Sequence, residues 1–326
     1  MSVTAAQGFR AAGVRAGLKA SGKPDLALVI NDGPLDTAAG VFTTNRVVAA
    51  PVVWSRRLLA GQDGGQPGHA RAVVLNSGSA NACTGAQGLR DTEGTAARAA
   101  GLVGIEPDQV LVCSTGVIGE RIDMPVLLEG VDVAALALAD TPQAGTDAAT
   151  AIMTTDTVSK EDALTVGTGE QSWTIGGMIK GVGMLAPGLA TMLAVLTTDA
   201  VLTPREAQDA LASVTARTVN RINSDGCMST NDTVLLLASG ASGTTPSQDE
   251  LDEALTEVMS RLGRRLVADA EGATHDIAIT VSGAVSEEAA EAAARTVSSS
   301  NLLKCAVAGA DPNWGRILSQ LGTVPE

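Results

Sequence analysis

The chain has 326 residues, 45% of them hydrophobic, which is enough to bury a large core in one large α/β unit or in about two domains. Its 36 acidic residues outnumber 22 basic residues, giving a formal net charge of −14, and it contains no Tyr, two Phe and three Trp. Nucleic-acid binding depends on clustered cations and aromatic stacking surfaces, so this composition argues against a nucleic-acid partner.

The sequence also argues against membrane, metal and nucleotide binding. No N-terminal segment has the pattern of a signal peptide and no apolar run reaches the ~18 residues of a membrane span, so we expect a cytoplasmic protein. The cysteines Cys83, Cys113, Cys227 and Cys305 form no C-x-x-C pair, and we expect each to be a small buried or half-buried residue. Only two histidines occur, and neither nucleotide-binding glycine motif is present, so no metal and no cofactor are expected.

Strand and helix patterns alternate along the chain, as in α/β proteins. In chain order, short apolar runs predict strands at residues 26–30, 40–43, 71–75, 109–113, 164–166, 173–175, 191–199, 234–237 and 277–281. Helices are predicted from the polar loop at 76–81 to about 102, over 124–153 with a break near 141–142, from 203 to about 220, over 247–271, and over 286–297. No repeat and no long flexible linker divides these segments.

Several polar residues stand next to these elements. Thr115 and Gly116 follow the strand at 109–113, where a hydroxyl and a backbone N–H can converge on an oxyanion, although a simple turn explains the same residues. Thr154 lies in a polar cluster that fits a loop, a cap or a substrate contact. Lys180 lies among glycines, near the reacting centre or solvated at a hairpin. Glu271 is placed at a helix C-terminus, where the dipole disfavours a carboxylate.

The stretch KGVGMLAPGLATML, residues 180–193, is the most informative one because a glycine-rich turn breaks into an apolar strand that begins with threonine. One interpretation is that the chain cuts itself between Ala190 and Thr191. The free α-amino group of Thr191 would then stand beside its own hydroxyl and activate it as a nucleophile. The alternative is an ordinary Gly/Pro-rich turn that enters a buried strand.

This stretch resembles the self-cleavage signature of the ornithine acetyltransferases of arginine biosynthesis. Further segments resemble that family in the same order: NSGSANACT (76–84), CSTG (113–116), AIMTTD (151–156), STNDT (229–233), DAEG (269–272) and DPNWGR (311–316). The resemblance covers nearly the whole chain. It implies an α/β fold, a layered sandwich of stacked β-sheets flanked by helices, of the ornithine acetyltransferase type.

The same resemblance implies an activity and its residues. Self-cleavage would give an α piece, residues 1–190, and a β piece, residues 191–326, that stay together as an (αβ)2 heterotetramer. Thr191 would take the acetyl group of N2-acetylornithine and pass it to glutamate in a ping-pong reaction, and acetyl-CoA is a possible second donor. The resemblance assigns Thr115 and Gly116 to the oxyanion hole, and Thr154, Lys180, Thr191 and Glu271 to substrate contacts.

The sequence departs from the family pattern in one respect, and two other functions remain open. Family members usually continue past DPNWGR and contribute an asparagine and a small hydroxyl residue from that region, so we expect a chain ending at Glu326 to be C-terminally truncated. A self-processing N-terminal-threonine amidase or peptidase would use the same nucleophile with water as acceptor. A non-catalytic small-molecule binding protein is the alternative from a different class.

Overall fold

The strands of this protein form two stacked sheets. The computed structural model describes residues 2–62, 66–185 and 192–324. Within these residues the four-stranded sheet has the order β1-β2-β4-β5 and the five-stranded sheet the order β3-β9-β8-β7-β6. The strands are β1 Phe9–Val14, β2 Leu26–Asn31, β3 Thr37–Phe42, β4 Ala72–Ser79, β5 Val110–Val117, β6 Lys160–Val166, β7 Trp173–Lys180, β8 Leu193–Thr198 and β9 Thr233–Ala238.

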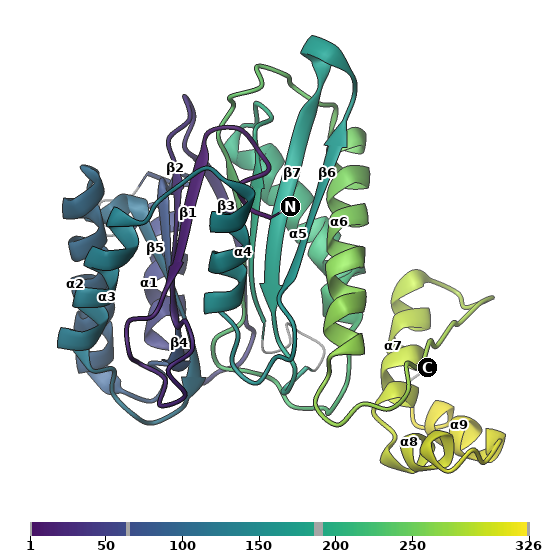
Figure 1. Ribbon diagram of the computed structural model, residues 1–326. Coiled ribbons are helices and arrows are strands. Elements are labelled where there is room, and N and C mark those ends of the chain that lie inside the picture. The colour runs from purple at the N-terminus through teal and green to yellow at the C-terminus, as the bar shows by residue number, and fades with distance from the viewer. Residues whose placement is uncertain (1, 63–65, 186–191, 325–326) are drawn as a thin grey trace.

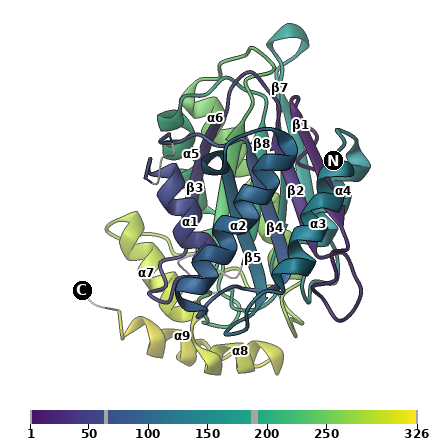
Figure 2. The same ribbon diagram turned by 90° about the vertical axis from the view of Figure 1, so that its left-hand side faces the viewer.

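Helices cover the outer faces of both sheets (Figures 1 and 2). The helices are α1 Ala50–Leu59, α2 Gly85–Val103, α3 Met124–Leu136, α4 Pro142–Ala151, α5 Pro204–Arg217, α6 Gln248–Ala268, α7 Glu287–Ser298, α8 Asn301–Ala308 and α9 Trp314–Leu321. Helices α2 and α3 lie on the first sheet, and α5 and α6 lie on the second. Helix α4 packs on β1 and β2 and also touches β6 and β7, so it closes one side of the sandwich.

The middle strands of the second sheet are apolar on both faces because both faces are covered. Leu193 and Val195 of β8 belong to the core between the sheets, whereas Ala194 and Leu196 belong to the core beneath α5 and α6. Side chains of a strand alternate between its two faces, so consecutive apolar residues are needed here. The apolar run therefore marks β8 as a central strand that is buried on both faces.

The pairing pattern links the two parts of the chain on either side of residues 186–191. Strand β7 pairs with β8 antiparallel, and β3 pairs with β9 antiparallel, so two strands from after this segment lie between strands from before it in one sheet. Strand β8 also runs parallel to β9. The ladder hydrogen bonds and both cores thus join the two parts into one folded unit.

Most predicted elements are confirmed, with small shifts at their ends. The capping box of α5 forms as expected, with Thr203 and Glu206 bonding reciprocally. Helix α6 has the same device and ends at Ala268, so Glu271 lies beyond the helix. Four of these strands and helices were not predicted: β1, whose Ala and Gly residues carry little strand signal, α1, which begins with a proline, and the short helices α8 and α9.

Two predictions are wrong. Residues 277–281 form no strand in the described structure, although their apolar residues alternate, because none of the described strands pairs with them. A strand needs hydrogen-bonding partners as well as a pattern. Cys83, Cys227 and Cys305 are exposed and only Cys113 is buried, since the first three lie in loops or on a small outer helix.

The C-terminal helices α7, α8 and α9 lie apart from both sheets, at the lower right of Figure 1. They contact one another, and α9 presents Trp314 and Leu318 to solvent. None of the helices in the described part of the chain combines the length and the apolar composition that a bilayer-spanning segment needs.

Candidate active site

Lys180 is the centre of a polar group at the ends of strands from both sheets. It is the last residue of β7 and its side chain is buried, with 1% of the residue exposed. Its Nζ lies 2.7 Å from Thr154 Oγ1 and 3.4 Å from Thr115 Oγ1. Thr115 lies near the end of β5, and Thr154 lies in the loop after α4. The fold therefore brings three of the predicted site residues together.

Burial lowers the pKa of Lys180 to about 8, while the nearby Asp156 carboxylate, 3.8 Å away, acts in the opposite direction. An ammonium can only donate hydrogen bonds, so the hydroxyl oxygens of Thr115 and Thr154 accept from it. The Thr115 hydrogen is then left to donate elsewhere. The Thr115 hydroxyl can therefore donate to a further oxygen while it accepts from Lys180.

Gly116 has a backbone that other residues do not readily adopt. Its φ is +136°, and a Cβ at this position would lie 2.3 Å from the carbonyl carbon of Gly78. The parallel pairing of β4 with β5 becomes irregular at the same place, at Gly78 and Ser79. The close approach of the two backbones explains why glycine follows Thr115.

Glu271 lies on the other side of the turn that follows Lys180. Its N–H donates to the Val182 carbonyl oxygen at 2.8 Å, and a Cβ on Gly183 would lie 3.1 Å from its Oε2. The residue is exposed. An exposed carboxylate at this position can receive a cationic group from solvent.

Ala190 and Thr191, the predicted cleavage pair, lie outside the described residues. The next residue, Met192, donates its N–H to Asp232 Oδ1 at 3.0 Å. The Asp232 carboxyl is fully buried, and burial raises its pKa well above the usual range. Its Oδ2 has no hydrogen-bond partner in the part of the chain that the structure describes. Asn231 adds a link to the other sheet, because its Nδ2 donates to the Ser114 carbonyl oxygen at 2.8 Å.

The sequence reasoning assigned no role to Asp156, Lys160, Asp232 or Asp269. In the structure Asp232 accepts the Met192 N–H. Three of these residues lie within the motifs 151–156, 229–233 and 269–272, which was the available signal. Lys160 lies outside those motifs, and its burial follows only from the packing of β6 against α6.

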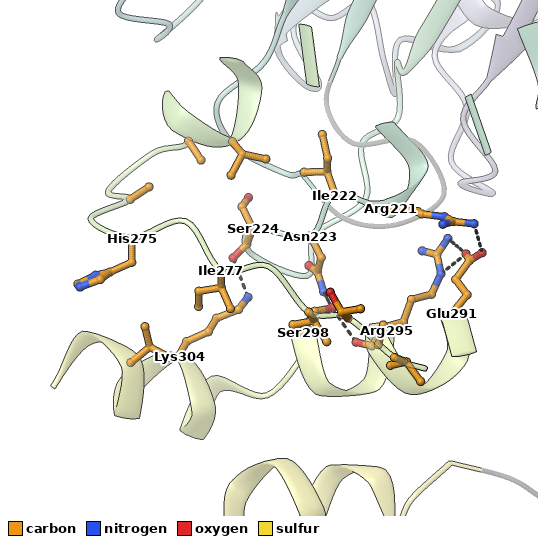
Figure 3. A pocket seen from close by; sticks show the side chains of 18 of the residues that line it. Arg221, Ile222, Asn223, Ser224, His275, Ile277, Glu291, Arg295, Ser298 and Lys304 are labelled. Atoms are coloured by element: carbon orange, nitrogen blue, oxygen red, sulfur yellow. Dashed lines mark hydrogen bonds and ion pairs between the residues drawn. The ribbon is translucent and has the colours of Figure 1, made fainter. Parts of the chain in front are cut away.

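A cavity of about 770 Å³ opens beside Glu271, between the turns at 221–224 and 270–281 and the helices α7 and α8. Figure 3 shows its polar lining: Lys304 Nζ donates to the Ser224 carbonyl oxygen at 2.7 Å, and Asn223 Nδ2 donates to Ser298 Oγ at 2.9 Å. Thr115, Gly116, Thr154 and Lys180 do not line it, so Glu271 is the only predicted site residue within the described ranges that borders the cavity. Its volume suits an amino-acid-sized ligand.

Comparisons with known proteins identify the family of this chain. The model of the ArgJ family matches residues 10–326. The arginine biosynthesis bifunctional protein ArgJ of Bifidobacterium longum is 59% identical over 326 residues, covering 100% of this chain and 81% of that protein. The protein of the same name from Streptomyces coelicolor is 55% identical over 323 residues, covering 99% of this chain and 81% of its own length.

A solved structure is similar as well. The crystal structure of ornithine acetyltransferase complexed with ornithine, from Mycobacterium tuberculosis, has 49% identity and a TM-score of 0.53, over 59% of this chain and 96% of that chain. The family model covers nearly all of the sequence, and both relatives exceed half identity over almost its full length. The chain therefore belongs to the ArgJ family.

Proposed function

We propose that this chain transfers the acetyl group of N2-acetylornithine to glutamate, with Thr191 as the residue that carries the acetyl group. Its membership of the ArgJ family makes it an acyltransferase of arginine biosynthesis. The buried group of Lys180, Thr115 and Thr154, at the ends of β5 and β7, supports placing the active site there. A cavity of about 770 Å³, large enough for an amino acid, borders Glu271.

The nucleophile arises by self-cleavage. The Thr191 hydroxyl attacks the Ala190 carbonyl carbon, the peptide C–N bond breaks as an ester forms, and the Thr191 nitrogen takes the proton. Water then hydrolyses the ester, leaving a carboxylate on Ala190 and a free α-amine on Thr191. That amine has an ordinary pKa near ~8 and serves as the base in later acyl transfers.

Two observations support this step. A piece ending at Ala190 would contain 190 of the 326 residues, about 58% of the chain. This share is close to the 59% of the chain that matches 96% of the Mycobacterium tuberculosis chain. The pairing of β8 and β9 with β7 and β3, which precede residues 186–191, also explains how two pieces would stay associated after a cut. We further propose that the protein is cytoplasmic and that two such αβ units pair. Light scattering of the purified protein tests the pairing.

Acyl transfer follows from the donors around Lys180. The Thr191 hydroxyl attacks the acetamide carbonyl carbon, and negative charge develops on the carbonyl oxygen. Thr115, whose oxygen accepts from Lys180, donates its hydrogen to that oxygen together with the Gly116 N–H. The tetrahedral intermediate collapses as the C–N bond breaks, and the released ornithine nitrogen takes the proton. Glutamate then attacks the threonine ester with its own amine and leaves as N-acetylglutamate.

Glu271 sets the specificity for a basic substrate. Its exposed carboxylate pairs with the side-chain ammonium of ornithine, and a charge-assisted hydrogen bond of this kind is about twice as strong as a neutral one. Because the two amino acids use the same threonine in turn, the kinetics are ping-pong. The word bifunctional in the relatives' name favours acetyl-CoA as a second donor, which release of free coenzyme A in the presence of glutamate would establish.

The decisive experiment supplies purified protein with N2-acetylornithine and glutamate and follows both products. Ornithine and N-acetylglutamate should form in equal amounts. Release of acetate without N-acetylglutamate would identify an amidase instead. Thr191→Ala should remain a single chain by intact mass and be inactive, whereas Thr191→Ser, which keeps a hydroxyl and an amine, should be cut and retain part of the activity. A Thr191→Ala protein that is still cut would refute the cleavage mechanism.

A further inference from the structure

Lys160, the first residue of β6, is a buried cation outside the group around Lys180. It is 0% exposed, and its Nζ lies 2.7 Å from Asp156 Oδ1 and 2.5 Å from Asp269 Oδ2. A buried charge is costly unless it is paired and hydrogen-bonded. The two carboxylates meet this requirement, and each of them also binds a segment that carries a candidate site residue.

Asp156 holds the Lys180 side of the site. Its Oδ1 accepts from the Gly181 N–H at 2.8 Å as well as from Lys160. Its Oδ2 accepts from the Thr154 N–H at 3.0 Å and lies 3.8 Å from Lys180 Nζ. The same carboxylate therefore fixes the backbone at Thr154 and the backbone directly after Lys180.

Asp269 holds the Glu271 side. It follows helix α6 directly, and it accepts hydrogen bonds from both the N–H and the hydroxyl of Thr157. Two residues further on, Glu271 joins the turn after Lys180 through the Val182 carbonyl oxygen. The contact between Asp269 and Lys160 thus fixes the position of the chain where α6 ends and the segment with Glu271 begins.

The four side chains form a buried row of alternating charge: Lys180, Asp156, Lys160 and Asp269. The neighbouring ammonium groups hold the pKa of Asp156 and that of Asp269 below the usual range against the effect of burial. Lys160 is one of the groups that lower the pKa of Lys180, behind burial itself; Lys19 acts in the same direction, and Asp156 and Asp232 oppose it.

We propose that Lys160 is a positioning residue for acetyl transfer, which fixes the distance between the Lys180 and Thr154 group and the Glu271 segment without touching the substrate. This inference rests on the proposed function of the same site. Removing Lys160 leaves the carboxylates of Asp156 and Asp269 with no ammonium between them, so the Asp269 end of the row separates and Glu271 moves relative to Lys180. A misplacement of about 1 Å in such a site can cost ~10²-fold in rate.

The test compares Lys160→Met with a matched control in the full chain. Arg261→Met removes a different ion pair between the same two elements, because Arg261 of α6 lies 3.1 Å from Asp162 of β6 and contacts none of the four charges in the row. Ping-pong kinetics with N2-acetylornithine and glutamate are measured for wild type and both variants, with cleavage verified by intact mass. We expect Lys160→Met to lower kcat/KM by about 10²-fold and Arg261→Met to stay close to wild type.

The pH profile separates positioning from a loss of stability. Lys160→Met removes a like charge beside Lys180, so the alkaline limb of kcat/KM should move to higher pH, whereas it should not move in Arg261→Met. Wild-type kinetics in a folded and cut Lys160→Met protein would overturn the inference. An equal fall in both variants with unmoved alkaline limbs would also overturn it.

A second variant keeps the inference testable where Lys160→Met does not fold. Asp269→Asn leaves Lys160 paired with Asp156 and weakens only the contact to the Glu271 segment. Its KM for N2-acetylornithine should rise while the alkaline limb stays near that of wild type, and an unchanged KM would overturn the inference. Wild-type protein without acetyl transfer would instead refute the proposed function, so the two failures are distinguishable.

Discussion

Replacing Lys180 with methionine should remove activity while changing the pH dependence of stability in a defined way. The folded protein lowers the pKa of Lys180 from 10.5 to about 8, mainly through burial. Between these two values the unfolded chain binds a proton that the folded chain has lost, so wild-type stability rises with pH. At about 1.36 kcal/mol per pKa unit, the gain between pH 8 and pH 9.5 is about 2 kcal/mol. Lys180→Met lacks this gain.

The assay is urea unfolding at pH 7, 8, 9 and 9.5, in a Thr191→Ala background so that a single chain unfolds. The difference in unfolding free energy, wild type minus Lys180→Met, should be flat from pH 7 to 8 and then rise by about 2 kcal/mol up to pH 9.5. Lys23→Met, at an exposed position, is the matched control and should show no such rise. A difference that stays flat or falls above pH 8 would refute the burial argument. With Thr191 present, Lys180→Met should lower kcat by about 10²–10³-fold because Thr115 loses its orienting donor.

Three further predictions concern neighbouring residues. Asp232→Asn keeps an acceptor for the Met192 N–H but does not ionise. Because folding raises the pKa of Asp232, wild type should lose stability relative to this variant as the pH rises from about 4 to 7. Urea unfolding of both proteins at pH 4 and pH 7 checks the sign of this change. Gly116→Ala should lower both activity and thermal stability because its Cβ meets the backbone of β4, whereas Gly119→Ala, at φ +89° in open space, should lose only the smaller cost of backbone strain, as a comparison of melting temperatures would show. Thr115→Val should lower kcat by about 10²-fold with little change in KM, and a KM effect alone in steady-state assays would argue against its oxyanion role.

Local features of the sequence determined much of the fold. The Thr203 and Glu206 capping box marked the start of α5, and the apolar run at 193–198 identified a strand that is buried on both faces. These signals act over a few residues, so they survive without knowledge of the rest of the chain. The predicted strand at 277–281 failed for the same reason, because a local pattern does not supply a neighbouring strand.

The sequence by itself also determined the candidate residues, since Thr115, Gly116, Thr154 and Lys180 stand in motifs next to strand ends. Only the tertiary structure decided how they act together. Lys180 meets Thr115 across 65 residues of sequence, and Lys160 meets Asp269 across 109. Contacts of this span depend on how two sheets and a helix pack, and the same packing buries Lys180 and thereby lowers its pKa. The residue types could therefore be identified from the sequence, whereas their burial, charge pairing and spacing depend on the packing of the two sheets and the helices.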